Sequence, residues 1–102
     1  MTLTCGIDAG SRTVKIVLLD ADAPCVLAAA VVDQGVRQEE IARRLYGGLL
    51  DETGAAPSQV VRCIATGYGR NLVSFADKTI TEITCHAVGV HHVWPEARTV
   101  VD

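Results

Sequence analysis

Residues 3–20 place a short acidic glycine turn between two apolar segments, and this pattern constrains the fold more than any other. Residues 3–8 carry alternating apolar side chains, and residues 13–20 are again rich in aliphatic ones. Two such segments joined by Asp8-Ala9-Gly10-Ser11 are predicted to form neighbouring antiparallel strands. Gly10 can adopt a positive φ without steric cost, so we expect a tight turn whose backbone N–H groups face an anion.

The acid at the mouth of this turn points to a metal ion. A carboxylate repels phosphate, but Asp8 suits a phosphate site if a hydrated Mg²⁺ lies between the two, because hard cations bind carboxylates, water and phosphate oxygens together. The Ser11 hydroxyl and the Lys15 ammonium would then contact the phosphates directly. The alternative is an ordinary β-hairpin, which a short glycine motif alone does not exclude.

The remaining pattern predicts an α/β fold. Residues 25–33 form a third strand, and residues 36–53 form a helix with an apolar stripe. Further strands are predicted at 59–66 and 78–82, then a helix over 83–94 and the beginning of a strand at 98–102. This order predicts a mixed sheet with a βββαβ start and helices packed on it, the layout of a ribonuclease-H-like lobe.

Composition excludes several classes of protein. The 102 residues are 49% hydrophobic with a net charge of −3, which suits one small domain with a real core and gives no basic footprint for nucleic acid. No apolar stretch reaches the roughly 18 residues of a membrane span, and no secretory signal is visible, so we expect a cytoplasmic protein. The four cysteines form no Cys-x-x-Cys pair and are predicted to be reduced thiols.

A second glycine-rich turn, Gly67-Tyr68-Gly69-Arg70, follows the strand predicted at 59–66. Ligand sites of α/β folds lie at such strand ends, so Arg70 is a candidate contact for a phosphate or a partner. The alternative is a tight turn with a surface arginine, for which the glycines suffice.

Five segments together resemble one known family. They are residues 6–15, 65–71, 76–78, 81–87 and 94–102. In this order and spacing the chain resembles the N-terminal lobe of the ATPases that activate 2-hydroxyacyl-CoA dehydratases and of the ATP-binding subunits of benzoyl-CoA reductase. These BadF/BadG/BcrA/BcrD-type proteins belong to the actin/Hsp70/acetate kinase/sugar kinase superfamily. The resemblance implies an ATPase lobe over residues 1–97 and the truncated first strand of a second lobe over 98–102.

The resemblance also implies an activity. Family members are homodimers that bind ATP or ADP with Mg²⁺, hold one [4Fe-4S] cluster between subunits and pass a low-potential electron to a partner iron–sulfur dehydratase or reductase. The family's cluster cysteines lie downstream of its second phosphate loop, and none of the four cysteines here matches them. We therefore expect the cluster only in a longer protein, and we expect these residues alone to be inactive as an ATPase.

Site residues follow from the same resemblance. Asp8, Gly10, Ser11 and Lys15 match the first phosphate motif, in which Asp8 holds Mg²⁺ through water. Asp102 matches the opening acid of the second phosphate loop. Glu82 lies where the superfamily places a group that orients the attacking water, and its alternative is a solvated charge at a helix start.

Two other functions stay open. One is a sugar or acetate kinase-like phosphotransferase lobe, and the sequence beyond residue 102 would distinguish it. The other is an isolated, non-catalytic ribonuclease-H-like interaction module, which binding of Mg²⁺–ADP would exclude. A catalytic ribonuclease H is disfavoured, because that chemistry needs several carboxylates around two metal ions.

Overall fold

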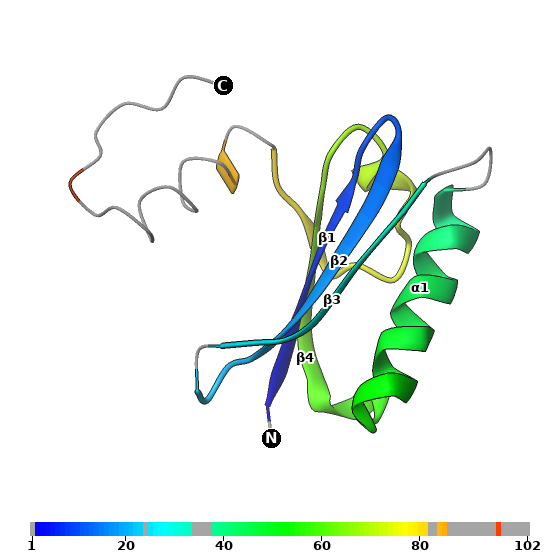
Figure 1. The fold of residues 1–102 in the computed structure, drawn as a ribbon. Coiled ribbons are helices and arrows are strands. Elements are labelled where there is room, and N and C mark those ends of the chain that lie inside the picture. The colour runs from blue at the N-terminus through cyan, green and yellow to red at the C-terminus, as the bar shows by residue number, and fades with distance from the viewer. Residues whose placement is uncertain (1, 24, 34–37, 82–83, 86–95, 97–102) are drawn as a thin grey trace.

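The computed structural model describes residues 2–23, 25–33, 38–81, 84–85 and 96, and these form a mixed sheet with one long helix (Figure 1). The strands are β1 (Leu3–Ala9), β2 (Thr13–Asp20), β3 (Cys25–Asp33), β4 (Val60–Thr66) and β5 (Lys78–Thr79). Helix α1 spans Gln38–Thr53, and short 3₁₀ turns lie at Pro57–Gln59 and Arg70–Leu72. The sheet order is β3-β2-β1-β4-β5.

Strand directions follow from the connections. Short turns join β1 to β2 and β2 to β3, and both pairs are antiparallel. The chain then crosses over through α1, so β4 runs parallel to β1, and β5 in turn runs parallel to β4. The carboxyl ends of β1, β4 and β5 therefore lie at one edge of the sheet, where α/β folds place ligands.

The core lies between the sheet and α1. Every second residue of β1 and β2 is buried, which places one set of side chains against the helix and leaves the other set on the opposite face. Burying a leucine or isoleucine contributes about 1.5–3 kcal/mol, so this layer supplies most of the stabilisation. The largest fully buried side chains are Leu3, Ile7, Val14, Ile16 and Leu18.

Helix α1 uses the predicted apolar stripe. Ile41, Leu45 and Leu49 all pack into or against the core cluster, and Leu49 is buried. The helix ends at Thr53 and is followed by Gly54, whose φ of 71° is left-handed, and the Ala55 N–H donates to the Leu50 carbonyl. A left-handed glycine after a helix is a common C-terminal cap, because it allows backbone N–H groups to donate to the last carbonyls of the helix.

The first helical turns are also fastened to the segment before β5. Ser74 donates to the Glu39 carboxylate and accepts a hydrogen bond from Arg43 at 2.7 Å. The Phe75 ring stacks on Tyr46 with centroids 5.1 Å apart, and the Arg43 guanidinium lies 5.3 Å from the Phe75 centroid. These contacts hold the chain after β4 against α1.

The βββαβ order, the mixed sheet and the helix packed on it are confirmed. The strand predicted at 78–82 is too long, because β5 has only two residues and Ile80 and Thr81 lie beyond it. The helix predicted over 83–94 and the strand over 98–102 fall almost wholly outside the described residues. In the part of the chain that the structure describes, no helix has the length and apolar character needed to cross a membrane.

Candidate functional site

Asp8 lies near the carboxyl end of β1, with a partner on each side. Its register partners are Lys15 on β2 and Thr66 on β4. The Lys15 Nζ is 3.8 Å from Asp8 Oδ2, and the two side chains are 56% and 42% exposed. An ion pair this exposed contributes at most about 1 kcal/mol, so both groups can exchange it for a ligand at little cost.

Thr66 brings an unused polar atom to the same place. Its hydroxyl oxygen is buried and has no hydrogen-bond partner within the described structure. Leaving a buried hydroxyl unsatisfied costs about 1–3 kcal/mol, and such orphans call for an explanation. Thr66 is thus a buried polar residue in register with Asp8 whose hydroxyl could take a hydrogen-bond partner from a ligand.

Gly67 packs its backbone directly against Asp8. Its φ is 92°, and a β-carbon built on it would meet Asp8 Oδ1 at 2.5 Å and the Ala9 carbonyl oxygen at 2.6 Å. The Gly69 N–H then donates to the Ala9 carbonyl at 2.8 Å. The loop after β4 is therefore fastened to the end of β1, and only glycine fits at position 67. The sequence interpretation missed this role, although a glycine directly after a predicted strand is a usable signal.

Gly10 behaves differently from the prediction. Among the described glycines only Gly54 and Gly67 have positive φ, so the expected left-handed conformation of Gly10 is wrong. Its N–H donates to the Thr13 carbonyl at 2.9 Å and closes the hairpin, and a β-carbon there would lie 3.2 Å from that same oxygen. The hydrogen bond to Thr13 closes this turn without a left-handed residue at position 10.

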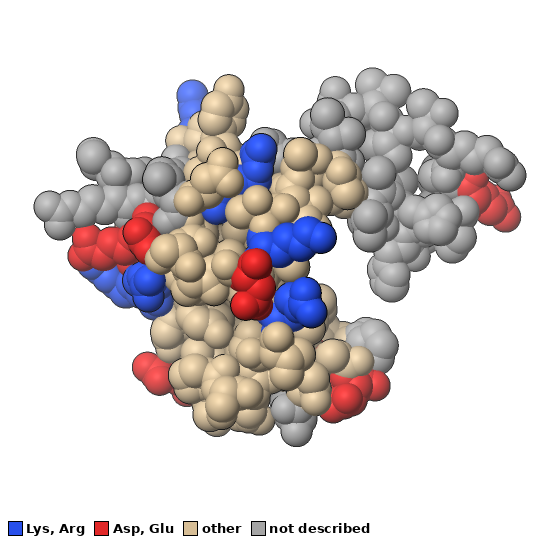
Figure 2. All heavy atoms as spheres, turned by 180° about the vertical axis from the view of Figure 1, so that it is seen from behind, with Lys and Arg blue, Asp and Glu red and all other residues tan. Residues whose placement is uncertain are grey.

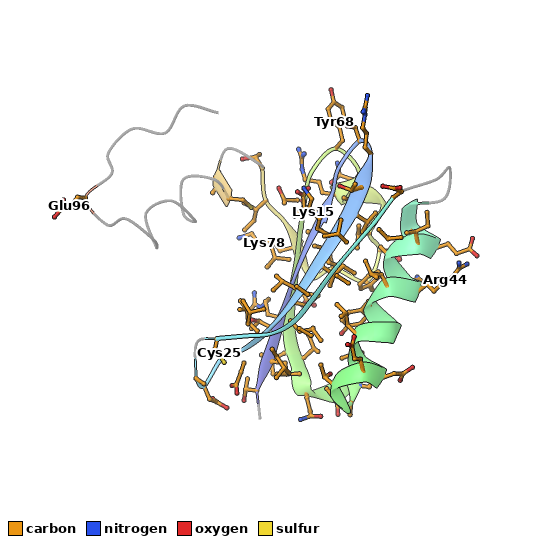
Figure 3. All side chains as sticks on the ribbon, viewed as in Figure 1. Lys15, Cys25, Arg44, Tyr68, Lys78 and Glu96 are labelled. Carbon is orange, nitrogen blue, oxygen red and sulfur yellow. The ribbon has the colours of Figure 1, made fainter. Side chains whose placement is uncertain are left out.

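A hollow of about 310 Å³ surrounds these groups on the sheet face turned away from α1. Apolar atoms form nearly all of its wall, and Asp8, Lys15, Thr66 and Cys85 are among the residues that line it. Figure 3 shows Lys15 and Lys78 on this side of the sheet and Tyr68 near the tip of the β1–β2 hairpin. A mainly apolar hollow with a few convergent polar groups is the usual form of a small-molecule site.

A larger hollow of about 520 Å³ lies elsewhere, between β3 and α1. Aliphatic residues such as Ala30 and Leu45 line it, and its Arg44 is already paired with Glu40 at 3.2 Å. Its lining residues do not include Asp8, Lys15 or Thr66. We therefore take the smaller hollow at Asp8 as the candidate site, because chemistry rather than volume distinguishes the two.

The other predicted residues divide into three groups. Ser11 is exposed in the hairpin turn beyond Asp8. Arg70 donates from its guanidinium to the Gly67 carbonyl at 3.0 Å, which favours the tight-turn alternative for that residue. Glu82 and Asp102 lie outside the described residues.

Charge is distributed without a dominant sign on the face seen in Figure 2. Acidic and basic side chains lie next to one another there, rather than in separate patches. Nucleic-acid binding requires a concentrated basic surface, and this face of the described chain does not present one.

Comparison with known proteins places the chain in a family. Residues 5–102 match the family model described as the BadF/BadG/BcrA/BcrD ATPase family. This chain belongs to that family. The activator of lactoyl-CoA dehydratase from Anaerotignum propionicum is 40% identical over 99 residues, which cover 97% of this chain and 38% of the relative. Our chain thus spans little more than a third of that BadF/BadG/BcrA/BcrD relative.

Two solved structures confirm the predicted fold class. Component A of (R)-2-hydroxyglutaryl-CoA dehydratase from Acidaminococcus fermentans superposes with a TM-score of 0.82 at 35% identity, covering 100% of this chain and 39% of that one. The activator of 2-hydroxyisocaproyl-CoA dehydratase from Clostridium difficile, solved with bound ADPNP, gives 0.80 at 35% identity, covering 96% and 36%. The matched part of these BadF/BadG/BcrA/BcrD-type proteins is their N-terminal lobe.

The cysteines do not converge on a metal cluster. Cys5 and Cys63 are buried in the core, whereas Cys25 is exposed at the start of β3. A search of the described residues finds no group of three or more His, Cys, Asp or Glu side chains that could hold a metal ion. The described part of the chain therefore does not fit a [4Fe-4S] cluster.

Proposed function

We propose that this chain forms one wall of the nucleotide site of an ATP-dependent activator of an acyl-CoA dehydratase or benzoyl-CoA reductase. The observation that carries the proposal is the meeting of Asp8, Thr66 and Gly67 at the carboxyl ends of two parallel strands. Support comes from the family match and from a relative solved with bound ADPNP. The complete activator would work as a homodimer on an iron–sulfur partner enzyme.

The residues present fit ATP or ADP with Mg²⁺. Asp8 would hold the hydrated Mg²⁺. The bound ion would neutralise part of the negative charge of the phosphates. Lys15 would leave its weak ion pair with Asp8 to contact a phosphate oxygen. Gly10 and Ser11 would border the same phosphates from the hairpin turn.

Thr66 and Gly67 complete this wall from β4. The Thr66 hydroxyl would donate to an oxygen of the bound group and so gain the partner that it lacks. Gly67 keeps the main chain against Asp8, which limits the directions in which the carboxylate can point. Glu82, as the group that orients water, and Asp102, as the acid of the opposite wall, remain part of the proposal on the family resemblance alone.

Calorimetric titration of the full-length gene product with Mg²⁺–ADP tests the proposal. We expect Asp8→Asn to weaken binding by about tenfold or more, equivalent to about 1.4 kcal/mol. Asp51→Asn, an exposed acid on α1, is the matched control and should bind as the unchanged protein does. Equal affinity of the Asp8→Asn variant, or no binding by the unchanged protein, would overturn the proposal.

A further inference from the structure

Two buried thiols lie side by side on the adjacent strands β1 and β4. They are part of the core and separate from the polar groups of the candidate site. Cys5 on β1 and Cys63 on β4 are register partners, and they are 3% and 4% exposed. Both belong to the core cluster between the sheet and α1, so their side chains share one face. Within the described chain neither forms a disulfide.

The backbone geometry suits a cross-link. Neighbouring strands lie about 4.7–4.9 Å apart, so two residues in register have Cα atoms near that separation. Disulfides span Cα separations of about 4.4–6.8 Å. Two in-register cysteines on one face of adjacent strands are therefore close enough to join without moving either strand far.

The two sulfurs are chemically unequal. A hydrogen bond between the thiols and burial raise the pKa of Cys5 far above its ordinary value, whereas the Cys5 hydrogen bond lowers the pKa of Cys63 despite burial and the nearby Asp77. The thiolate is the reactive form of cysteine, and a lowered pKa favours that form at Cys63.

Cys63 lies on β4, one strand from the edge of the sheet. Beyond β4 the sheet continues only as the two-residue β5, and Asp77 is fastened to Cys63 by local bonds. The Cys63 N–H donates to the Asp77 carboxylate at 2.6 Å, and the Asp77 N–H donates to the Cys63 carbonyl at 2.7 Å. Because both thiols are buried, peroxide reaches Cys63 only during a local opening, and local openings cost less free energy than global unfolding.

We propose that Cys5 and Cys63 form an oxidisable dithiol that hydrogen peroxide converts to a disulfide between β1 and β4. The Cys63 thiolate attacks one peroxide oxygen, so that an S–O bond forms, the O–O bond breaks and hydroxide leaves. The Cys5 sulfur then attacks the Cys63 sulfur, which forms the S–S bond, breaks the S–O bond and releases water with the Cys5 proton. Two thiols and one peroxide give one disulfide and two waters, and a dithiol reductant reverses the change.

Peptide mapping of the folded, full-length protein tests this inference. The reduced protein is treated with hydrogen peroxide, blocked with a thiol reagent and digested without reductant. We expect a cross-linked pair of peptides containing Cys5 and Cys63, which dithiothreitol separates. Exposed Cys25 reports in the same digest that peroxide reached the protein.

Variants assign the two roles. Cys5→Ser should leave Cys63 as a sulfenic acid that dimedone traps, whereas Cys63→Ser should leave Cys5 largely unmodified. A folded protein in which Cys25 is oxidised while both core thiols stay free would overturn the inference. So would a cross-link that appears only in urea. Because the unchanged protein gives the main result, a variant that fails to fold leaves the test intact. The inference does not depend on the proposed nucleotide site.

Discussion

The Asp8 carboxylate lies against the backbone of Gly67, so closely that a β-carbon at position 67 would stand 2.5 Å from Asp8 Oδ1. Asp8 lies on β1 and Gly67 directly follows β4, and the two meet because β1 and β4 pair in parallel. The position of the carboxylate is therefore determined by main chain as well as by its ion pair with Lys15. Main-chain support of this kind is rigid, as a binding site requires.

Replacing Gly67 with alanine should destabilise the protein and disturb the site together. A left-handed φ of 92° and three contacts under 3.0 Å all oppose a β-carbon. We expect a loss of about 1–3 kcal/mol in the free energy of unfolding, measured by urea denaturation. Gly47→Ala is the control, because nothing lies within 4 Å of its β-carbon position and α1 should gain about 0.5–1 kcal/mol. Equal effects of the two substitutions would contradict the account.

Thr66→Val should lower the affinity for Mg²⁺–ADP without lowering the stability of the protein. Valine has nearly the same shape but no hydroxyl, so it removes the unsatisfied buried oxygen. We expect the nucleotide-free protein to be unchanged or more stable by up to about 1–3 kcal/mol, while its affinity for Mg²⁺–ADP falls. Thermal unfolding and calorimetry check the two parts. The control is Thr79→Val, because Thr79 is exposed on β5. If Thr66→Val lowers stability but leaves the affinity for Mg²⁺–ADP unchanged, Thr66 does not belong to the binding site.

Glu39→Gln should weaken the attachment of α1 to the segment before β5 in a pH-dependent way. The Ser74 hydroxyl, followed by Arg43, holds the pKa of Glu39 below its ordinary value of 4.5. A lowered pKa in the folded state stabilises the protein above the unfolded-state pKa, and this contribution is lost as pH falls through the folded value. The stability difference between the two proteins should therefore be present at pH 7 and shrink below pH 4.5. A difference independent of pH would contradict this interpretation.

Phe75→Leu should test the aromatic part of the same attachment. The substitution keeps an apolar side chain but removes the stack on Tyr46 and the contact with the Arg43 guanidinium. We expect a loss of about 0.5–1.5 kcal/mol beyond the change in buried area, measured by chemical denaturation. Tyr68→Leu is the control, because its side chain is 83% exposed and should change stability by less than about 0.5 kcal/mol.

Local patterns predicted most of the fold. Alternation in residues 3–8 and 13–20, and the stripe at Ile41, Leu45 and Leu49, are determined by burial against one partner layer, so they are readable in the chain. The length of β5 could not be predicted from the sequence. The length of an edge strand depends on its backbone hydrogen bonds to the neighbouring strand, and the apolar content of its own residues does not determine these bonds.

The candidate site was predicted only in part. Asp8 and Lys15 lie on one hairpin, so their proximity follows from the local turn. Thr66 and Gly67 reach Asp8 only through the parallel pairing of β1 with β4, which spacing along the chain does not reveal. The left-handed conformation expected for Gly10 was wrong, because its N–H closes the hairpin on the Thr13 carbonyl without a positive φ.

The dependence of ADP affinity on Mg²⁺ tests the central claim most directly. In the full-length protein we expect Mg²⁺ to tighten ADP binding by about tenfold or more, because Asp8 contributes through the metal ion. In Asp8→Asn the affinities with and without Mg²⁺ should become nearly equal. The account is contradicted if the unchanged protein binds ADP equally well without Mg²⁺, or if Asp8→Asn keeps the full metal dependence.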